Sequence, residues 1–172
     1  MFCNFVTYEH FTYFNLLHTG MSEPNFETLL GKNISEAPRL GSVTNLGADI
    51  YSISEPKVLF LGRPLQHIAI GTKEDKVISS IYITFQSPND PTFYSSLREA
   101  YGEDYEVMVK DKIESQTTST REDGEFKETL QKREILLKEG NINDTDIAFI
   151  IWIKKNYQIE FFPNRGVHFN GK

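Results

Sequence analysis

The sequence predicts an α+β domain with a mainly antiparallel sheet of about six to eight strands and helices packed on one face. Two apolar runs, residues 147–153 and 157–162, flank a polar turn and indicate a β-hairpin. Between residues 49 and 85, short apolar and β-branched runs are joined by brief polar links, as in an antiparallel meander. The helix signals are few, and they stand apart from the strand runs.

The segment before residue 49 predicts a short helix followed by a loop. Residues 22–30 carry an apolar stripe at helical spacing, with Ser22 or Asn25 as the N-cap and Gly31 as the stop. Residues 32–48 contain proline and glycine, so we expect a loop with one helical turn. The meander that follows is predicted to contain four strands, at residues 50–54, 57–61, 65–70 and 77–85.

The clearest helix signal covers residues 90–102. Asp90 is a good N-cap, Pro91 fits the first helical position, and Gly102 can end the helix in a left-handed conformation. Residues 106–114 predict a further strand.

The polar segment after this strand is harder to assign. Residues 115–124 are expected to form a mobile loop. Residues 125–139 predict a second long helix that ends at Gly140, although the apolar run at 135–137 suits a strand equally well. After the hairpin, residues 163–172 are expected to form a polar tail.

The hairpin is predicted to lie at the centre of the sheet. Its first run, residues 147–153, is almost continuously apolar, which suits a strand buried on both faces. Trp152 is therefore expected in the core. The segment from Tyr51 can also be laid over the segment from Trp152 without a gap, so that Val58 matches Ile159. Two duplicated helix-plus-sheet units would explain this match, and so would chance likeness between two Ile- and Phe-rich hairpins.

Composition restricts the class of protein. The chain has 172 residues, which suits one domain, and a net charge of -6, which argues against nucleic-acid binding. No run approaches the length of a membrane span. Cys3 is the single cysteine, and with no basic start for a secretory signal we expect a cytoplasmic protein.

Residues 1–20 are rich in aromatic side chains and are set apart as an N-terminal extension of the domain at 21–172. We favour a natural start at Met21, which would make the extension non-native. In the alternative, the extension is native and docks its aromatic side chains on the domain, because exposing them would leave a large apolar patch.

No catalytic, cofactor or metal motif stands out in the sequence. The four histidines lack ligand spacing, and the Asn- and Asp-rich loop at 141–146 lacks the glycine and closing glutamate of a calcium loop. No serine lies in a Gly-x-Ser-x-Gly elbow. We therefore expect no enzyme, no cofactor and no bound metal.

The order of helix, antiparallel strands, helix and antiparallel strands is combined with a helix that ends in Leu97-x-x-x-Tyr101-Gly102 and with Trp152 on a later strand. In these features the sequence resembles small bacterial proteins with duplicated α/β units, such as β-lactamase inhibitor proteins. In size and acidity it is similar to immunity proteins that neutralise bacterial toxins. The resemblance implies a small non-catalytic inhibitor, and it assigns no binding residue.

We accordingly expect a protein-binding module, with an immunity or inhibitor protein as the specific case and a basic toxin domain as its partner. Acidic residues cluster at 99–106 and at 121–128. Carboxylates would steer the encounter and tyrosines would supply the contact centre. The candidate contact residues are Glu99, Tyr101, Glu103, Asp104, Tyr105 and Glu106.

Three other interpretations stay open. The carboxylates could serve solubility alone. An enzyme could assemble its site from distant residues, which a deep pocket with shifted carboxylates or with His67 would support. A structural or oligomerisation module would be favoured by the aromatic N-terminus, and a mass measurement in solution would test it.

Overall fold

The computed structural model describes residues 21–85, 91–123, 126–163 and 165–172, and these residues form ten strands. The strands of the first half are β1 (Ser42–Gly47), β2 (Ile50–Ser54), β3 (Leu59–Phe60), β4 (Arg63–Thr72) and β5 (Ile78–Phe85). Those of the second half are β6 (Glu106–Asp123), β7 (Phe126–Glu139), β8 (Ile147–Ile153), β9 (Tyr157–Phe162) and β10 (Gly166–Gly171).

All ten strands belong to one antiparallel sheet. Its order is β1-β2-β4-β5-β10-β9-β8-β6-β7, and β3 pairs with β4 off this path. The mainly antiparallel sheet is confirmed, with more strands than expected. The fold is mostly β with some α.

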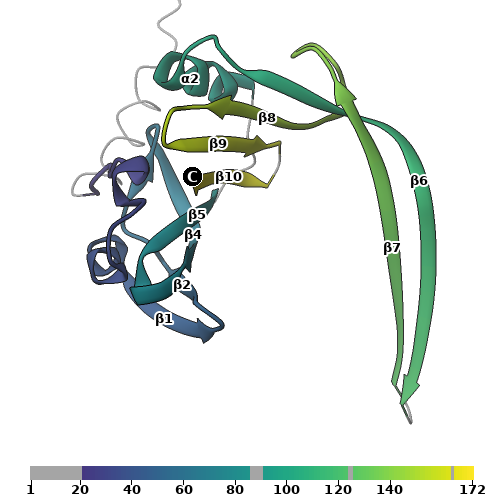
Figure 1. Cartoon of the computed structure of the whole chain (residues 1–172), viewed down its shortest axis with the longest axis horizontal. Coiled ribbons are helices and arrows are strands. Elements are labelled where there is room, and N and C mark those ends of the chain that lie inside the picture. Colours follow the sequence, from purple (N-terminus) through teal and green to yellow (C-terminus); the bar gives the residue numbers. More distant parts are fainter. Residues whose placement is uncertain (1–20, 86–90, 124–125, 164) are drawn as a thin grey trace, which may run out of the picture.

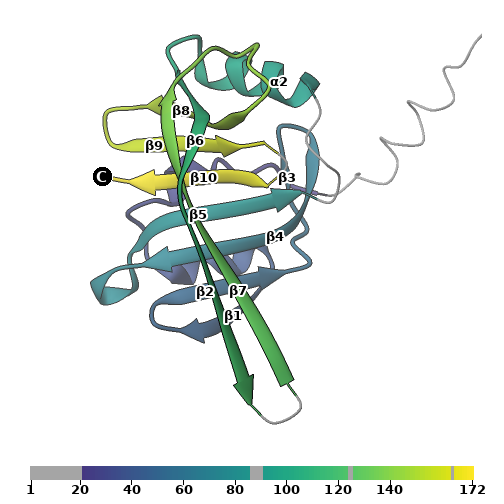
Figure 2. The same cartoon turned by 90° about the vertical axis from the view of Figure 1, so that its right-hand side faces the viewer.

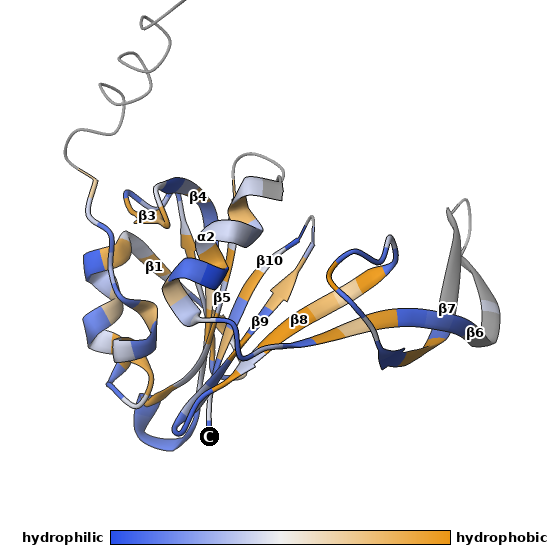
Figure 3. Ribbon diagram, turned by 90° about the horizontal axis from the view of Figure 1, so that it is seen from above, coloured by the Kyte–Doolittle hydropathy of each residue, from blue (hydrophilic) through white to orange (hydrophobic). Residues whose placement is uncertain are grey.

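Short helices cover one face of the sheet. Within the described ranges, the 3-10 helices are η1 (Phe26–Leu29), η2 (Ile34–Leu40) and η3 (Glu74–Lys76), and α2 (Pro91–Tyr101) is an α-helix. Figures 1 and 3 show η1, η2 and α2 on the same side of the sheet. Apolar side chains from these three helices join those of the sheet in one core cluster.

Helix α2 matches its prediction, and Gly102 follows it with a left-handed φ of 91°. The expected cap Asp90 lies outside the described residues. The helix expected at 22–30 is a single 3-10 turn without a side-chain cap. The expected loop at 32–48 contains η2 and β1, and Asn33 caps η2 by accepting a hydrogen bond from the Ser35 backbone N–H at 3.1 Å.

Two expectations about the second half are wrong. The long helix expected at 125–139 is not formed: residues 126–139 are strand β7, whose backbone pairs with β6 along its length. The polar residues 115–123, expected in a mobile loop, are the second part of β6. The strand alternative that we considered for 135–137 is confirmed.

The C-terminal segment is also not a polar tail. Strand β10 lies at the middle of the sheet, where Val167 pairs with Ile83 of β5 and with Phe161 of β9. Strand β8 is buried on one face rather than two: Trp152 is fully buried, as predicted, whereas Ile153 is 50% exposed. The N-terminal extension at 1–20 lies outside the described residues.

The second half carries a long two-stranded ribbon that the first half lacks. The start of β6 pairs with β8, from Glu106 opposite Ile151 to Val109 opposite Ile147. Beyond residue 110, β6 pairs with β7 alone, and Figures 1 and 2 show this ribbon standing away from the sheet on the face opposite the helices. We call residues 111–123 and 126–139 the arm.

Candidate functional site

The six predicted contact residues lie where α2 passes into β6. Glu99 and Tyr101 belong to the last turn of the helix, and Glu106 is the first residue of the strand. The four carboxylates are exposed, and Tyr101 and Tyr105 are half-buried. We call residues 98–106 the junction. The second acidic cluster, at 121–128, lies apart from it at the far end of the arm, and residues 124–125 within it are not described.

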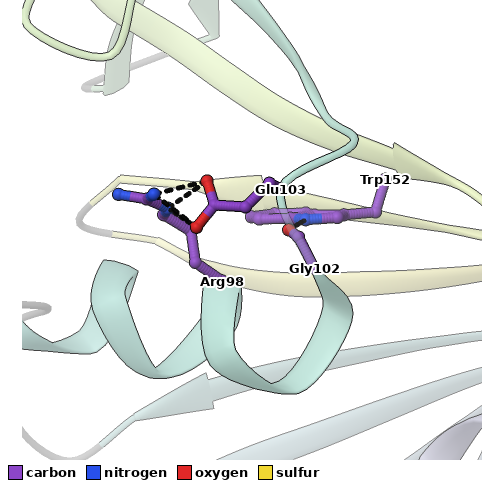
Figure 4. A network of polar contacts seen from close by, with 4 residues as sticks. All are labelled: Arg98, Gly102, Glu103 and Trp152. Atoms are coloured by element: carbon purple, nitrogen blue, oxygen red, sulfur yellow. Dashed lines mark hydrogen bonds and ion pairs between the residues drawn. The ribbon is translucent and has the colours of Figure 1, made fainter.

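Buried Trp152 fixes the backbone of the junction. Its indole Nε1–H donates a hydrogen bond of 2.9 Å to the carbonyl oxygen of Gly102 (Figure 4). The ammonium of Lys154 donates a second bond, of 2.6 Å, to the carbonyl of Tyr101. Both donors come from the end of the hairpin, so the core of the sheet holds the exposed segment in one conformation.

An ion pair closes the turn after α2. The guanidinium of Arg98 faces both carboxylate oxygens of Glu103, with its Nε–H donating to them at 3.0 and 2.9 Å (Figure 4). The carboxylate raises the pKa of Arg98. The carboxylate of Glu103 is therefore already neutralised by Arg98. Within the described ranges, no ion pair involves Glu99, Asp104 or Glu106.

Two tyrosine rings of the junction pack against Trp152, and a third ring, from α2, packs against one of them. The Tyr105 ring centroid lies 5.7 Å from that of Trp152, and the Tyr101 centroid lies 6.3 Å away. Tyr94 packs edge-on against Tyr105 at 5.9 Å. Ring pairs at these distances are mutually stabilising, so the aromatic residues of the junction continue the core to the surface.

Burial, and then the nearby carboxylate of Glu27, raise the pKa of Tyr101. In the unfolded chain a tyrosine ionises near about pH 10, so stability is full below that pH and falls as the pH rises towards the higher folded-state pKa. Tyr101→Phe is expected to lose less stability than the wild type between about pH 9 and about pH 11. Urea midpoints at the two pH values measure this. Equal losses in both proteins would show that the Tyr101 hydroxyl is not desolvated.

Two hollows flank the junction. One, of about 320 Å³, is lined by Tyr105, Glu106, Val107, Glu139, Gly140, Asn141 and Ile142. The other, of about 330 Å³, is lined by Glu23, Leu61, Gly62, Ser96, Glu99 and Ala100. Each contains two glutamates, and neither has a lysine or arginine in its lining. Both hollows therefore favour positively charged groups.

Histidine contacts that the sequence did not reveal lie on the sheet face opposite the helices. His67 Nε2 is 2.7 Å from the Ser52 hydroxyl, and His168 Nδ1 is 3.1 Å from a carboxylate oxygen of Glu160. Both pairs join neighbouring strands, and the strand register that brings the two side chains together is not apparent from the sequence. A nucleophilic serine needs a third group that orients the histidine, and no such group contacts His67 in the described residues.

No group of three potential metal ligands is found among the described residues. None of the helices within those ranges is long and apolar enough to cross a membrane. No protein-family model, no curated protein and no solved structure matches this chain.

Proposed function

We propose that this chain is a non-catalytic protein-binding module that recognises a basic partner through the junction. One observation carries the proposal. Glu99, Asp104 and Glu106 are exposed carboxylates that form no ion pair with any described residue. They lie on a segment that hydrogen bonds tie to the buried Trp152 and to Lys154. The specific case we propose is an immunity or inhibitor protein whose partner is a basic toxin domain.

A preformed surface favours tight binding because little conformational freedom is lost on association. The backbone at residues 101 and 102 is already held by Lys154 and Trp152. Tyr101 and Tyr105 offer ring surface that is half-buried before binding. In this proposal the unpaired carboxylates accelerate the encounter, and the tyrosines form the contact that slows dissociation.

A photo-crosslinking experiment identifies the partner. A benzophenone amino acid replaces Asp104 in the full chain, expressed in its native cell, and a matched variant carries the same group at Glu74 of η3, which is also exposed. We expect a basic protein to be crosslinked at position 104 and not at 74. Identical products at both positions would contradict the proposal.

The recovered protein then serves for kinetics. Because unpaired carboxylates steer association, the rate at which this partner associates with the wild-type chain is expected to fall about tenfold or more between low and high salt. Asp104→Lys is expected to reduce the low-salt rate and its salt dependence, and Glu74→Lys to change neither. Rates that respond to neither salt nor Asp104→Lys would remove the junction from the interface.

We also propose that the two halves descend from one duplicated helix-plus-sheet unit. The order β1-β2-β4-β5 of the first half is repeated in reverse by β10-β9-β8-β6, and the halves meet where β5 pairs with β10. Tyr51 and Trp152 lie on the corresponding strands β2 and β8. The same ungapped match sets Phe60 against Phe161, and here it fails, because Phe60 lies on β3 whereas Phe161 lies on β9, the strand that corresponds to β4. Superposing the two halves tests the proposal, and a poor fit of these strands would contradict it.

A further inference from the structure

Strand β7 leaves one edge of the sheet open. It has 14 residues, pairs on one side with β6, and is the last strand of the sheet in the described part of the chain. Figure 2 shows the arm extending well beyond the neighbouring strands. The outer edge of β7 therefore presents a row of backbone N–H and C=O groups that another strand can pair with.

Charges on an edge strand usually keep a second copy away. In β7 the order of the charged residues instead favours pairing with a second copy. When the strand is reversed about Arg133, position 127 falls opposite 139, 128 opposite 138, and 132 opposite 134. Each of these matches joins a lysine to a glutamate. No other two-fold register of the strand joins more than two such pairs.

We propose that β7 pairs antiparallel with the β7 of a second copy, around a two-fold axis at Arg133. The two arms would then form a continuous four-stranded ribbon, β6-β7-β7-β6. Every match occurs twice because the interface is symmetric, so three matches give six opposite-charge pairs. Residues directly opposite in an antiparallel pair share one face, which is the geometry in which such pairs stabilise a sheet.

Apolar positions follow the same register. Leu130 falls opposite Leu136 of the second copy, and this match also occurs twice. Ile135 and Leu137 are 40% and 42% exposed, which is high for large apolar side chains, and both lie within the paired segment. Pairing with a second copy reduces this exposed apolar surface.

Two features modify the charge pattern. Lys138 already forms an ion pair of 2.7 Å with Asp111 on the β6 side, so in the dimer it would lie between that carboxylate and position 128 of the second copy. Arg133 falls opposite itself and is the single like-charge match. This match weakens the dimer but leaves the register unchanged.

Charge reversal tests the interface on the full chain. Sedimentation equilibrium over a concentration series is compared for the wild type, Lys132→Glu, Glu134→Lys and the double variant. Each single change turns two attractive matches into repulsive ones, so we expect the dimer dissociation constant to rise about tenfold or more. The double variant restores opposite charges at both matches and is expected to return close to the wild-type value.

Cysteine crosslinking tests the register independently. In a Cys3→Ser background, Arg133→Cys places two thiols on the axis, at about the Cα separation of 4.5–5.5 Å that a disulfide accepts. Lys127→Cys is the matched control, because its own copy is about 40 Å away along the strand. Under mild oxidation, we expect a disulfide-linked dimer from position 133 and none from position 127.

Several results would overturn the proposal. A monomeric wild type at every concentration, together with no disulfide at position 133, excludes the dimer. A dimer whose affinity is equal in all four charge variants forms through another surface. A double variant as weak as the single ones shows that these two positions do not face each other. Circular dichroism of each variant distinguishes these results from misfolding.

The junction takes no part in this dimer. The dimer proposal would therefore stand even if the junction proved not to bind a partner.

Discussion

Trp152→Ala is expected to lower the free energy of unfolding by about 3 to 5 kcal/mol. The side chain is fully buried and is the largest in the core. Its removal leaves a cavity beneath Tyr101 and Tyr105, whose rings pack against it. The carbonyl of Gly102 also loses its indole donor, so the junction is expected to become less ordered.

Urea unfolding of the variant measures the loss. Ile153→Ala is the matched control on the same strand: its side chain is half-exposed, so the expected cost is below about 1 kcal/mol. Trp152 is the single tryptophan, and its fluorescence reports its own environment. Wild-type emission as red-shifted as that of the unfolded chain would contradict its burial.

Gly166→Ala is expected to cost about 3 kcal/mol, because it would separate the two central strands of the sheet. A Cβ atom at this position would lie 2.0 Å from the carbonyl oxygen of Ile83 on β5. The obstacle is backbone rather than a flexible side chain, so relief requires β5 and β10 to move apart. This pairing joins the two halves of the molecule.

Gly171→Ala, at the other end of β10, is the matched control. Its Cβ would lie 3.3 Å from the carbonyl oxygen of Ser79, a contact that a shift of a few tenths of an ångström relieves. We expect thermal unfolding to show a large decrease for Gly166→Ala and a small one for Gly171→Ala. Equal decreases would show that the close approach to Ile83 does not determine the cost.

Local patterns in the sequence predicted the parts of the fold that local patterns control. Helix α2 has its stop at Gly102, and the hairpin of β8 and β9 follows from two apolar runs around a turn. Strand β10 has only Val167 and Phe169 as an alternating signal. Its place at the middle of the sheet depends on pairing with β5, which is distant in the sequence, as well as with the preceding strand β9.

The arm was missed for a different reason. Its strands lie away from the core, so the apolar alternation that marks a half-buried strand is weak. Residues 126–139 are instead rich in lysine, glutamate and leucine, which favour helices. Pairing with β6 decides the outcome, and intrinsic propensity does not predict that pairing.

For the candidate site, the sequence predicted the contiguous acidic segment at 99–106. It did not predict the ion pair and the hydrogen bonds that fix the conformation of this segment. Glu103 and Arg98 are near in sequence, yet their ion pair depends on the turn at Gly102. The donors Trp152 and Lys154 lie at the end of β8 and just after it, about fifty residues further along the chain, and only the folded sheet brings them to the end of α2.

The central position of β10 also bears on synthesis of the protein. The edge of β5 that accepts Val167 is made about eighty residues earlier, and at about 5–20 residues per second it waits roughly 4 to 16 s for its partner. During that interval a nascent first half has an apolar, unpaired strand at its margin. Chaperones that shield such edges on the ribosome would therefore be expected to increase the yield of folded protein.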